Sequence, residues 1–151
     1  MKIVFLDIDG VLVTANSMLA KPSLMSHLEP ACVELLNKLC LEQGLNNCRV
    51  VISSSWRNLF SVSEIVNHLK QAKFNPDFIH HDWSTVCLLN GTRGDEIAVW
   101  LKQHAEVNDF VIIDDDNDFL PSQLCHHVQT DFADGFCESH LEQALNILGT
   151  N

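Results

Sequence analysis

The sequence predicts an α/β fold: a three-layer open parallel sheet with helices on both faces and no large cap domain. Apolar residues run without alternation through residues 2–6, 49–52 and 110–113, which is typical of central strands that helices bury on both faces. Polar residues follow each run directly. Helical patterns separate the runs, and strands that alternate with helices indicate a parallel sheet.

Four segments carry the helical pattern, and two more are weaker strand candidates. Pro30 and a Ser-x-x-Glu cap at Ser61 to Glu64 are typical helix starts. The helical segments are residues 30–40, 61–72, 94–104 and 138–148, and the weaker strands are residues 78–80 and 127–129. We expect residues 1–151 to form one compact domain, since single domains commonly have roughly 100 to 150 residues.

Composition favours a soluble, cytoplasmic protein that does not enter a membrane. The longest apolar runs fall short of the roughly 18 residues that a membrane-spanning helix needs. The six cysteines form no Cys-x-x-Cys pair, and most lie inside apolar segments, so we expect free thiols.

The net charge of −11 does not favour a nucleic-acid partner, because such binding depends on Lys and Arg neutralising phosphates. Six of the 20 acidic residues, however, fall in two clusters, and the remaining 14 exceed the 9 basic residues by only five. A cation bound among the clustered acids would leave a mildly acidic surface, so nucleic acid stays possible.

The two acidic clusters are expected to share one site. Asp7 and Asp9 follow the first strand, and Asp114 and Asp115 follow the third apolar run; ligands in such sheets bind outside the carboxyl ends of the strands. Two carboxylates about 4 Å apart repel by roughly 4 kcal/mol at an effective dielectric near 20. A bound cation would compensate, and an all-oxygen site with few ligands suits Mg²⁺.

The spacing of the acidic residues after the third apolar run argues against a calcium site of the EF-hand type. Asp114, Asp116 and Asp118 mimic the first acidic positions of an EF-hand loop, but Phe119 and Cys125 stand where Gly and Glu belong. Of Asp116 and Asp118, Asp118 is the better candidate to contact the Mg²⁺ expected at the acidic clusters.

Residues 80–82 and 125–127 are rich in His and Cys, the residue types that bind zinc. Adjacent residues on an extended chain point in opposite directions, so neither run supplies convergent ligands by itself. We therefore expect no structural zinc there.

The ordered motifs resemble those of the haloacid-dehalogenase-like (HAD) superfamily, whose fold is Rossmann-like. Residues 5–12, Phe-Leu-Asp-Ile-Asp-Gly-Val-Leu, are similar to its first motif, and Ser53 after an apolar strand to its second. Arg93 best matches the third motif, and Asp114 with Asp115 the fourth. The resemblance spans almost the whole chain.

The resemblance implies a phosphatase that works through an aspartyl-phosphate. Asp7 would attack phosphorus, and Asp9 would protonate the leaving oxygen and then activate water. Mg²⁺ would be held by the Asp7 carboxylate, the Asp9 backbone carbonyl, and Asp115 with Asp114 beside it.

The remaining roles concern the phosphoryl group. Ser53 would hydrogen-bond it, Arg93 would neutralise its charge, and Gly10 would let the backbone pass close to the ligand. Because three serines follow one another, the phosphate-binding residue of the second motif is either Ser53 or Ser54, and Ser53 is favoured.

The run Ser-Ser-Ser-Trp-Arg at residues 53–57 is similar to one in HAD domains associated with RNA-repair proteins. Arg57 could clamp a phosphate while Trp56 stacks on a base. The alternative places Trp56 in the core and Arg57 on the surface.

Three functions are compatible with these motifs. The first is a phosphomonoesterase with an open site, since neither interval between strands can hold a full cap; its phosphorylated substrate would be a nucleic-acid end, a nucleotide or a phosphoprotein. The second is a non-catalytic binding module with the HAD fold. The third is a phosphotransferase that passes the phosphoryl group to an alcohol.

Overall fold

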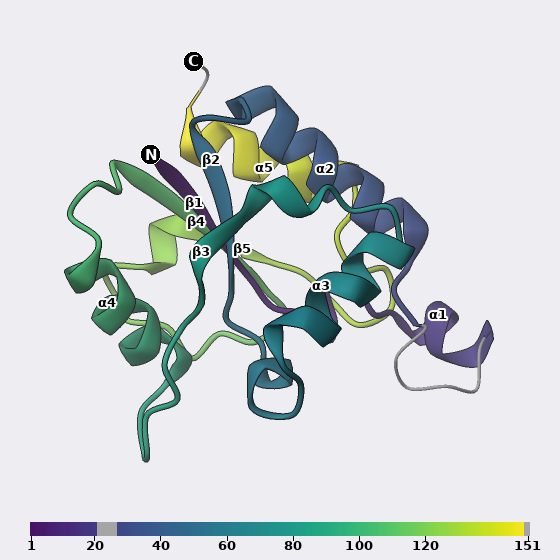
Figure 1. Ribbon diagram of the computed structural model, residues 1–151, viewed down its shortest axis with the longest axis horizontal. Coiled ribbons are helices and arrows are strands. Elements are labelled where there is room, and N and C mark those ends of the chain that lie inside the picture. Colours follow the sequence, from purple (N-terminus) through teal and green to yellow (C-terminus); the bar gives the residue numbers. More distant parts are fainter. Residues whose placement is uncertain (21–26, 150–151) are drawn as a thin grey trace.

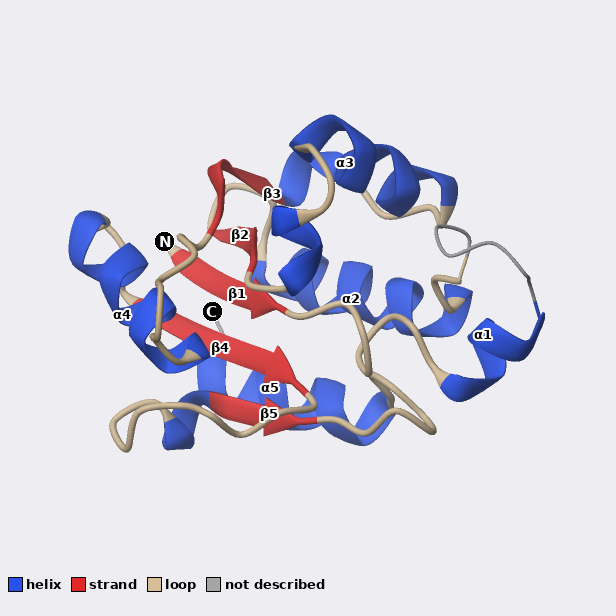
Figure 2. Ribbon diagram, turned by 90° about the horizontal axis from the view of Figure 1, so that it is seen from below, coloured by secondary structure: helices blue, strands red, loops and turns tan. Residues whose placement is uncertain are grey.

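The protein contains a five-stranded, fully parallel sheet in the order β3-β2-β1-β4-β5. The structure, a computed structural model, describes residues 1–20 and 27–149. The strands lie side by side in Figure 2 and are β1 (Lys2–Leu6), β2 (Cys48–Ile52), β3 (Ile79–Ser84), β4 (Asp109–Asp114) and β5 (His127–Gln129). All five predicted strands are confirmed, although β3 extends four residues beyond its predicted end.

Helices cover both faces, which confirms the predicted three layers. Figure 1 shows α4 on one side of the sheet and α2, α3 and α5 on the other. The helices are α1 (Ala15–Ala20), α2 (Pro30–Gln43), α3 (Val62–Gln71), α4 (Arg93–Gln103) and α5 (Glu138–Leu148). Three short 3₁₀ turns are η1 (Ser55–Asn58), η2 (Pro76–Phe78) and η3 (Leu124–His126). The four predicted helices are present, and α1 was not predicted.

The core divides between the two faces because successive residues of a strand point in opposite directions. Val4 and Leu6 pack with α2, α3 and α5 in the larger cluster. Ile3 and Phe5 pack under α4, where the Phe5 ring meets the edge of Trp100 at a centroid distance of 5.4 Å. All four β1 side chains are fully buried, so β1 is a central strand, as its continuous apolar run predicts.

Local signals account for where the helices begin. Pro30 occupies the first turn of α2, and the predicted Ser61–Glu64 capping box forms at α3. Thr92 and Asp95 make a second capping box at α4. Each box satisfies backbone N–H groups that have no partner in a first helical turn.

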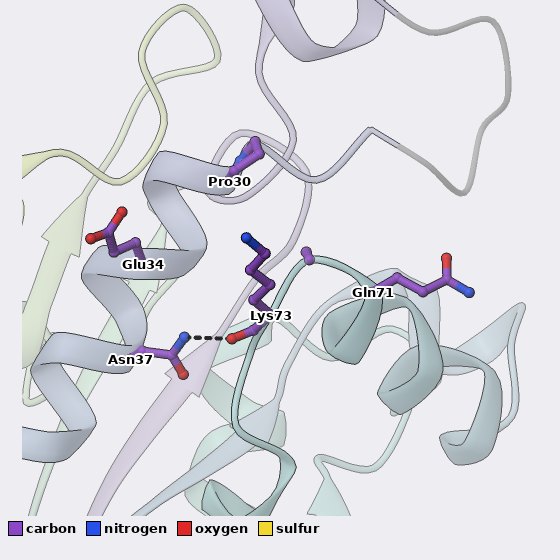
Figure 3. Close-up of a pocket in the computed structure, with 6 residues that line it drawn as sticks. Pro30, Glu34, Asn37, Gln71 and Lys73 are labelled. Atoms are coloured by element: carbon purple, nitrogen blue, oxygen red, sulfur yellow. Dashed lines mark hydrogen bonds between the residues drawn. The ribbon is translucent and has the colours of Figure 1, made fainter.

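The end of α3 is fastened to α2 by one side chain. Asn37 donates from Nδ2 to the Lys73 carbonyl at 2.9 Å, and its Oδ1 accepts from the Asn75 backbone N–H at 2.9 Å. Figure 3 shows the contact of Asn37 with Lys73 at a hollow of about 470 Å³ whose wall includes Pro30 and Glu34.

Within the described residues, no helix is both long and apolar enough to cross a bilayer.

A buried ion pair joins η1 to α4, and its removal should destabilise the fold. Arg57 contacts Glu96, and their side chains are only 6% and 8% exposed. Glu96→Ala would leave the guanidinium buried without its partner, which typically costs about 3–5 kcal/mol. We expect a loss of that order in the free energy of unfolding measured by urea titration.

The matched control is Glu138→Ala, which removes the exposed pair of Lys38 and Glu138, 3.7 Å apart and 69% exposed at Glu138. Exposed pairs contribute about 0–1 kcal/mol. Equal effects of the two substitutions would contradict the assignment of Arg57 and Glu96 as a stabilising buried pair.

Candidate active site

Strand register brings three polar residues to one edge of the sheet. Leu6 of β1 pairs with Ile52 of β2 and with Ile113 of β4, so the residues that follow each strand emerge together. The ladder continues one step further, because the Asp7 N–H donates to Ile113 and the Ser53 N–H donates to Leu6. Asp7, Ser53 and Asp114 therefore lie side by side, as the sequence predicts.

Three carboxylates converge at this edge. Asp7, Asp114 and Asp115 each offer an oxygen, and these oxygens lie within 4.8 Å of one another. Asp7 is 5% exposed and Asp114 is 1% exposed. One Asp114 oxygen accepts from the Asp116 backbone N–H at 3.0 Å, whereas its Oδ2 is buried and finds no hydrogen-bond donor in residues 1–20 and 27–149.

Arg93 supplies positive charge to this group. Its Nη1 donates to Asp7 Oδ1 at 3.1 Å, lies 3.6 Å from Asp114 Oδ2, and also donates to the Ser53 carbonyl. Arg93 is the first residue of α4, and its backbone N–H donates to Asp118 Oδ2 at 3.1 Å. Asp118, expected beside a metal, thus contacts the start of α4 and offsets the unfavourable cation there.

Burial and mutual repulsion raise the pKa values of these carboxyls. Desolvation by burial is the largest cause for Asp7, opposed by the Arg93 charge. Desolvation, followed by the Asp7 charge, raises the pKa of Asp114 to about 7, and desolvation also raises the pKa of Asp115. One guanidinium does not compensate three close carboxylates, so the site favours an additional cation.

The donors fit Mg²⁺, a hard cation that takes carboxylate and carbonyl oxygens. Gly10 keeps the approach to them open: its φ is +75°, and a Cβ there would lie 2.3 Å from Asp115 Cγ. The Gly10 carbonyl accepts from the hydroxyl of Thr130 at 2.8 Å. Sequence reasoning missed Thr130, whose position after the weak strand β5 was its only signal.

Asp9 stands apart from the three carboxylates and is exposed. Its Oδ2 accepts from Trp56 Nε1 at 2.9 Å, while the Trp56 ring is 7% exposed and belongs to the core. The structure thus favours a place for Trp56 in the core over a role in stacking on a base. It also shows a contact with Asp9 that the sequence did not predict.

The two serines have different surroundings. The Ser54 hydroxyl hydrogen-bonds the Asp7 carboxylate, which lowers the pKa of Asp7 against the larger effect of burial. Ser54 Oγ also accepts from the Trp56 backbone N–H at 3.3 Å. Ser53 Oγ is buried without a hydrogen-bond partner among the described residues. Ser53 therefore keeps its donor for a ligand.

Arg57 lies behind the serines, and the expectation of a substrate clamp is not supported. Its guanidinium donates to the carbonyls of Ser53 and Ser54 and to Glu96. With its side chain 6% exposed, Arg57 is not on the surface either. It positions the loop after β2.

A largely apolar cavity of about 220 Å³ opens beside Asp9. Its wall combines aromatic, aliphatic and thioether side chains with one buried histidine, and consists of Asp9, Val13, Met18, His27, Ser55, Trp56, Leu59 and Phe60. Sequence reasoning did not find this cavity because its wall is drawn from four separate segments.

The parallel sheet, with Asp7, Asp9, Ser53, Arg93 and the fourth-motif carboxylates at its carboxyl edge, defines a HAD-like domain. A family model confirms this: residues 3–141 match the family described as the HAD domain in Swiss Army Knife RNA repair proteins. The chain belongs to this family. Comparison with curated proteins and with solved structures gives no match.

The pKa of Asp114 predicts how the metal-free protein responds to pH. Its folded-state pKa of about 7 exceeds the ordinary value of 3.8, so the folded state binds more protons than the unfolded state between these values. Stability from this group is therefore lost as pH rises from about 4 through 7. In EDTA, Asp114→Asn should become more stable than the wild type by roughly 1–3 kcal/mol across that window.

Urea unfolding at intervals of one pH unit measures this difference. Asp116→Asn is the control, because Asp116 is exposed and should follow the wild type. If the free energies of unfolding of the wild type and Asp114→Asn differed by the same amount at every pH, Asp114 would not be a buried carboxyl that its neighbours repel.

Proposed function

We propose that this protein, with residues 1–151 acting as one domain, is a Mg²⁺-dependent phosphomonoesterase that forms an aspartyl-phosphate on Asp7. The observation that carries the proposal is the contact of Asp7 with Arg93 beside Asp114 and Asp115, at the edge from which Asp9 also projects. A nucleophile, a phosphate-neutralising cation and a metal-binding group thus meet in one place.

The covalent step uses Asp7 and Arg93. An Asp7 carboxylate oxygen attacks phosphorus in line, forming an O–P bond as the bond to the leaving oxygen breaks. Arg93, already 3.1 Å from Asp7, neutralises the phosphoryl oxygens. The Asp7 carboxylate, the Asp9 backbone carbonyl, Asp114 and Asp115 would hold Mg²⁺, which would supply the positive charge that lets one anion approach another.

Asp9 moves the proton in both steps. In its acid form it donates a proton to the leaving oxygen; as a carboxylate it then takes a proton from the water that attacks the phosphorus and frees Asp7. The Trp56 indole N–H, 2.9 Å from Asp9 Oδ2, holds this carboxyl in place.

We assign the phosphate-binding hydroxyl to Ser53 and a positioning role to Ser54. The Ser53 hydroxyl has no hydrogen-bond partner in the described part of the chain, and Ser53 shares with Val51 the face of the sheet that α4 covers. Arg93 reaches the site from that same face. Ser54 already hydrogen-bonds Asp7 and so orients the nucleophile.

The cavity beside Asp9 fits the leaving group, because Asp9 protonates the leaving oxygen. With about 220 Å³ and apolar walls, it accommodates one ring system, such as an aryl group or a nucleobase. Nucleotides and phosphorylated nucleic-acid ends suit this cavity better than an aliphatic phosphoprotein side chain does.

All described cysteines are free, which agrees with a reducing compartment such as the cytoplasm.

Two alternatives use the same site. A binding module would hold a phosphate without turnover, but the intact set of Asp7, Asp9 and Arg93 favours catalysis. A phosphotransferase would form the same intermediate and pass it to an alcohol. Product analysis with glycerol present separates that outcome from hydrolysis.

Asp7→Asn should abolish turnover. The amide is a poor nucleophile, so phosphate release from an aryl phosphate in Mg²⁺ should fall at least about 10³-fold, while the folded state remains intact by circular dichroism. EDTA should stop the wild type equally, and Asp116→Asn is the matched control that retains activity. Turnover by Asp7→Asn would exclude the aspartyl-phosphate.

Trp56→Phe should weaken the general acid selectively. It removes the indole N–H that holds Asp9 but keeps an aromatic ring in the core. We expect kcat to fall by roughly 10-fold for an alkyl phosphate, whose leaving oxygen must be protonated, and clearly less for a nitrophenyl phosphate. Trp83→Phe, in the partly buried part of β3, is the control. Equal losses on both substrates would show that Trp56 acts only through packing.

A further inference from the structure

A second group of potential metal ligands lies at the opposite edge of the sheet. His80 is near the start of β3, His104 is the C-cap of α4, and Glu106 follows two residues later. A donor atom from each lies within 4.8 Å of the other two. Arg93 and His104 stand at opposite ends of α4, about 16 Å apart at 1.5 Å per residue.

The buried imidazole of His80 is the observation that points to a ligand. His80 is 3% exposed, and its Nε2 has no hydrogen-bond partner among the described residues. Its Nδ1 lies 3.1 Å from both the Asp82 carbonyl and the Asp82 backbone N–H. In the tautomer whose Nδ1–H donates to the carbonyl, Nε2 is unprotonated and keeps its lone pair for a metal. Leaving such a buried polar atom unpaired costs about 1–3 kcal/mol.

His104 has the arrangement expected of a metal ligand. Its Nδ1 is 2.7 Å from the Trp100 carbonyl; a carbonyl only accepts, so Nδ1 carries the hydrogen and Nε2 keeps its lone pair in the neutral ring. The ring stacks on Trp100 at a centroid distance of 3.6 Å and a 10° interplanar angle. Metal-bound histidines are typically fixed by such a hydrogen bond from the other nitrogen.

Carboxylates complete the donor set. Glu106 is exposed, so its side chain is free to swing toward the two rings. Asp82 Oδ2 lies 3.4 Å from His104 Nε2 and offers a fourth donor. Two imidazoles with carboxylate oxygens suit Zn²⁺ or a similar divalent transition metal, whereas Mg²⁺ prefers oxygen alone.

We propose that His80, His104 and Glu106, with Asp82 beside them, form a transition-metal site that clamps the end of α4 to β3. The site is separate from the carboxylate group at the catalytic edge and does not depend on the proposed phosphatase activity. The sequence did not indicate it, because the ligands come from separate segments rather than from the adjacent histidines at residues 80 and 81.

The test is titration of the full chain, first stripped with EDTA and dialysed, with Zn²⁺ in excess Mg²⁺ that occupies the oxygen site. We expect one Zn²⁺ per chain by calorimetry and, with Co²⁺ as probe, the intense visible absorption of a tetrahedral centre. Zn²⁺ should also raise the melting temperature of the wild type.

Glu106→Gln, a surface substitution that should fold normally, is expected to weaken Zn²⁺ binding at least about tenfold, and His80→Gln or His104→Gln more strongly. His126→Gln is the matched control: this ring stacks on Phe110 outside the cluster and should leave binding unchanged. Absence of Zn²⁺ binding to the wild type, or undiminished binding in the Glu106 and His104 variants, would overturn the proposal.

Discussion

The Arg93 guanidinium holds together groups that would otherwise repel one another. Through Nη1 it contacts the Asp7 carboxylate after β1, the Asp114 carboxylate after β4 and the Ser53 carbonyl after β2. Two carboxylates at such separations repel by several kcal/mol in a partly buried setting. Strand register forces them together, so the fold depends on α4 delivering a positive charge to this edge.

The start of α4 is accordingly fixed from several directions. A Cβ on Gly94 would lie 2.6 Å from the Leu120 backbone nitrogen, so only glycine permits this approach. The buried Gln123 side chain donates to the Gly94 carbonyl at 2.9 Å and accepts from the Leu120 N–H at 3.0 Å. Glu96, one turn along, accepts from Arg57. Both the loop after β2 and the loop after β4 therefore contact the first turns of α4.

The sequence predicts the sheet well, since burial on both faces requires continuous apolar runs and leaves polar residues only at the strand ends. It identifies Asp7 and Asp114 for the same reason. It does not predict the partners of long side chains: Trp56 meets Asp9, 47 positions away, and Arg57 meets Glu96, 39 positions away. Those contacts depend on how η1 packs against the loop after β1 and against α4, which no local pattern encodes.

The adjacent histidines on β3 show how the two edges of the sheet differ. Neighbouring histidines on β3 do point apart, with His80 buried and His81 exposed, but α4 returns His104 to the buried one. The carboxyl edge presents oxygen donors only, and the opposite edge presents imidazoles. Because hard Mg²⁺ prefers oxygen donors and softer Zn²⁺ prefers imidazoles, the two proposed metal sites would take different ions, and α4 runs from one site to the other.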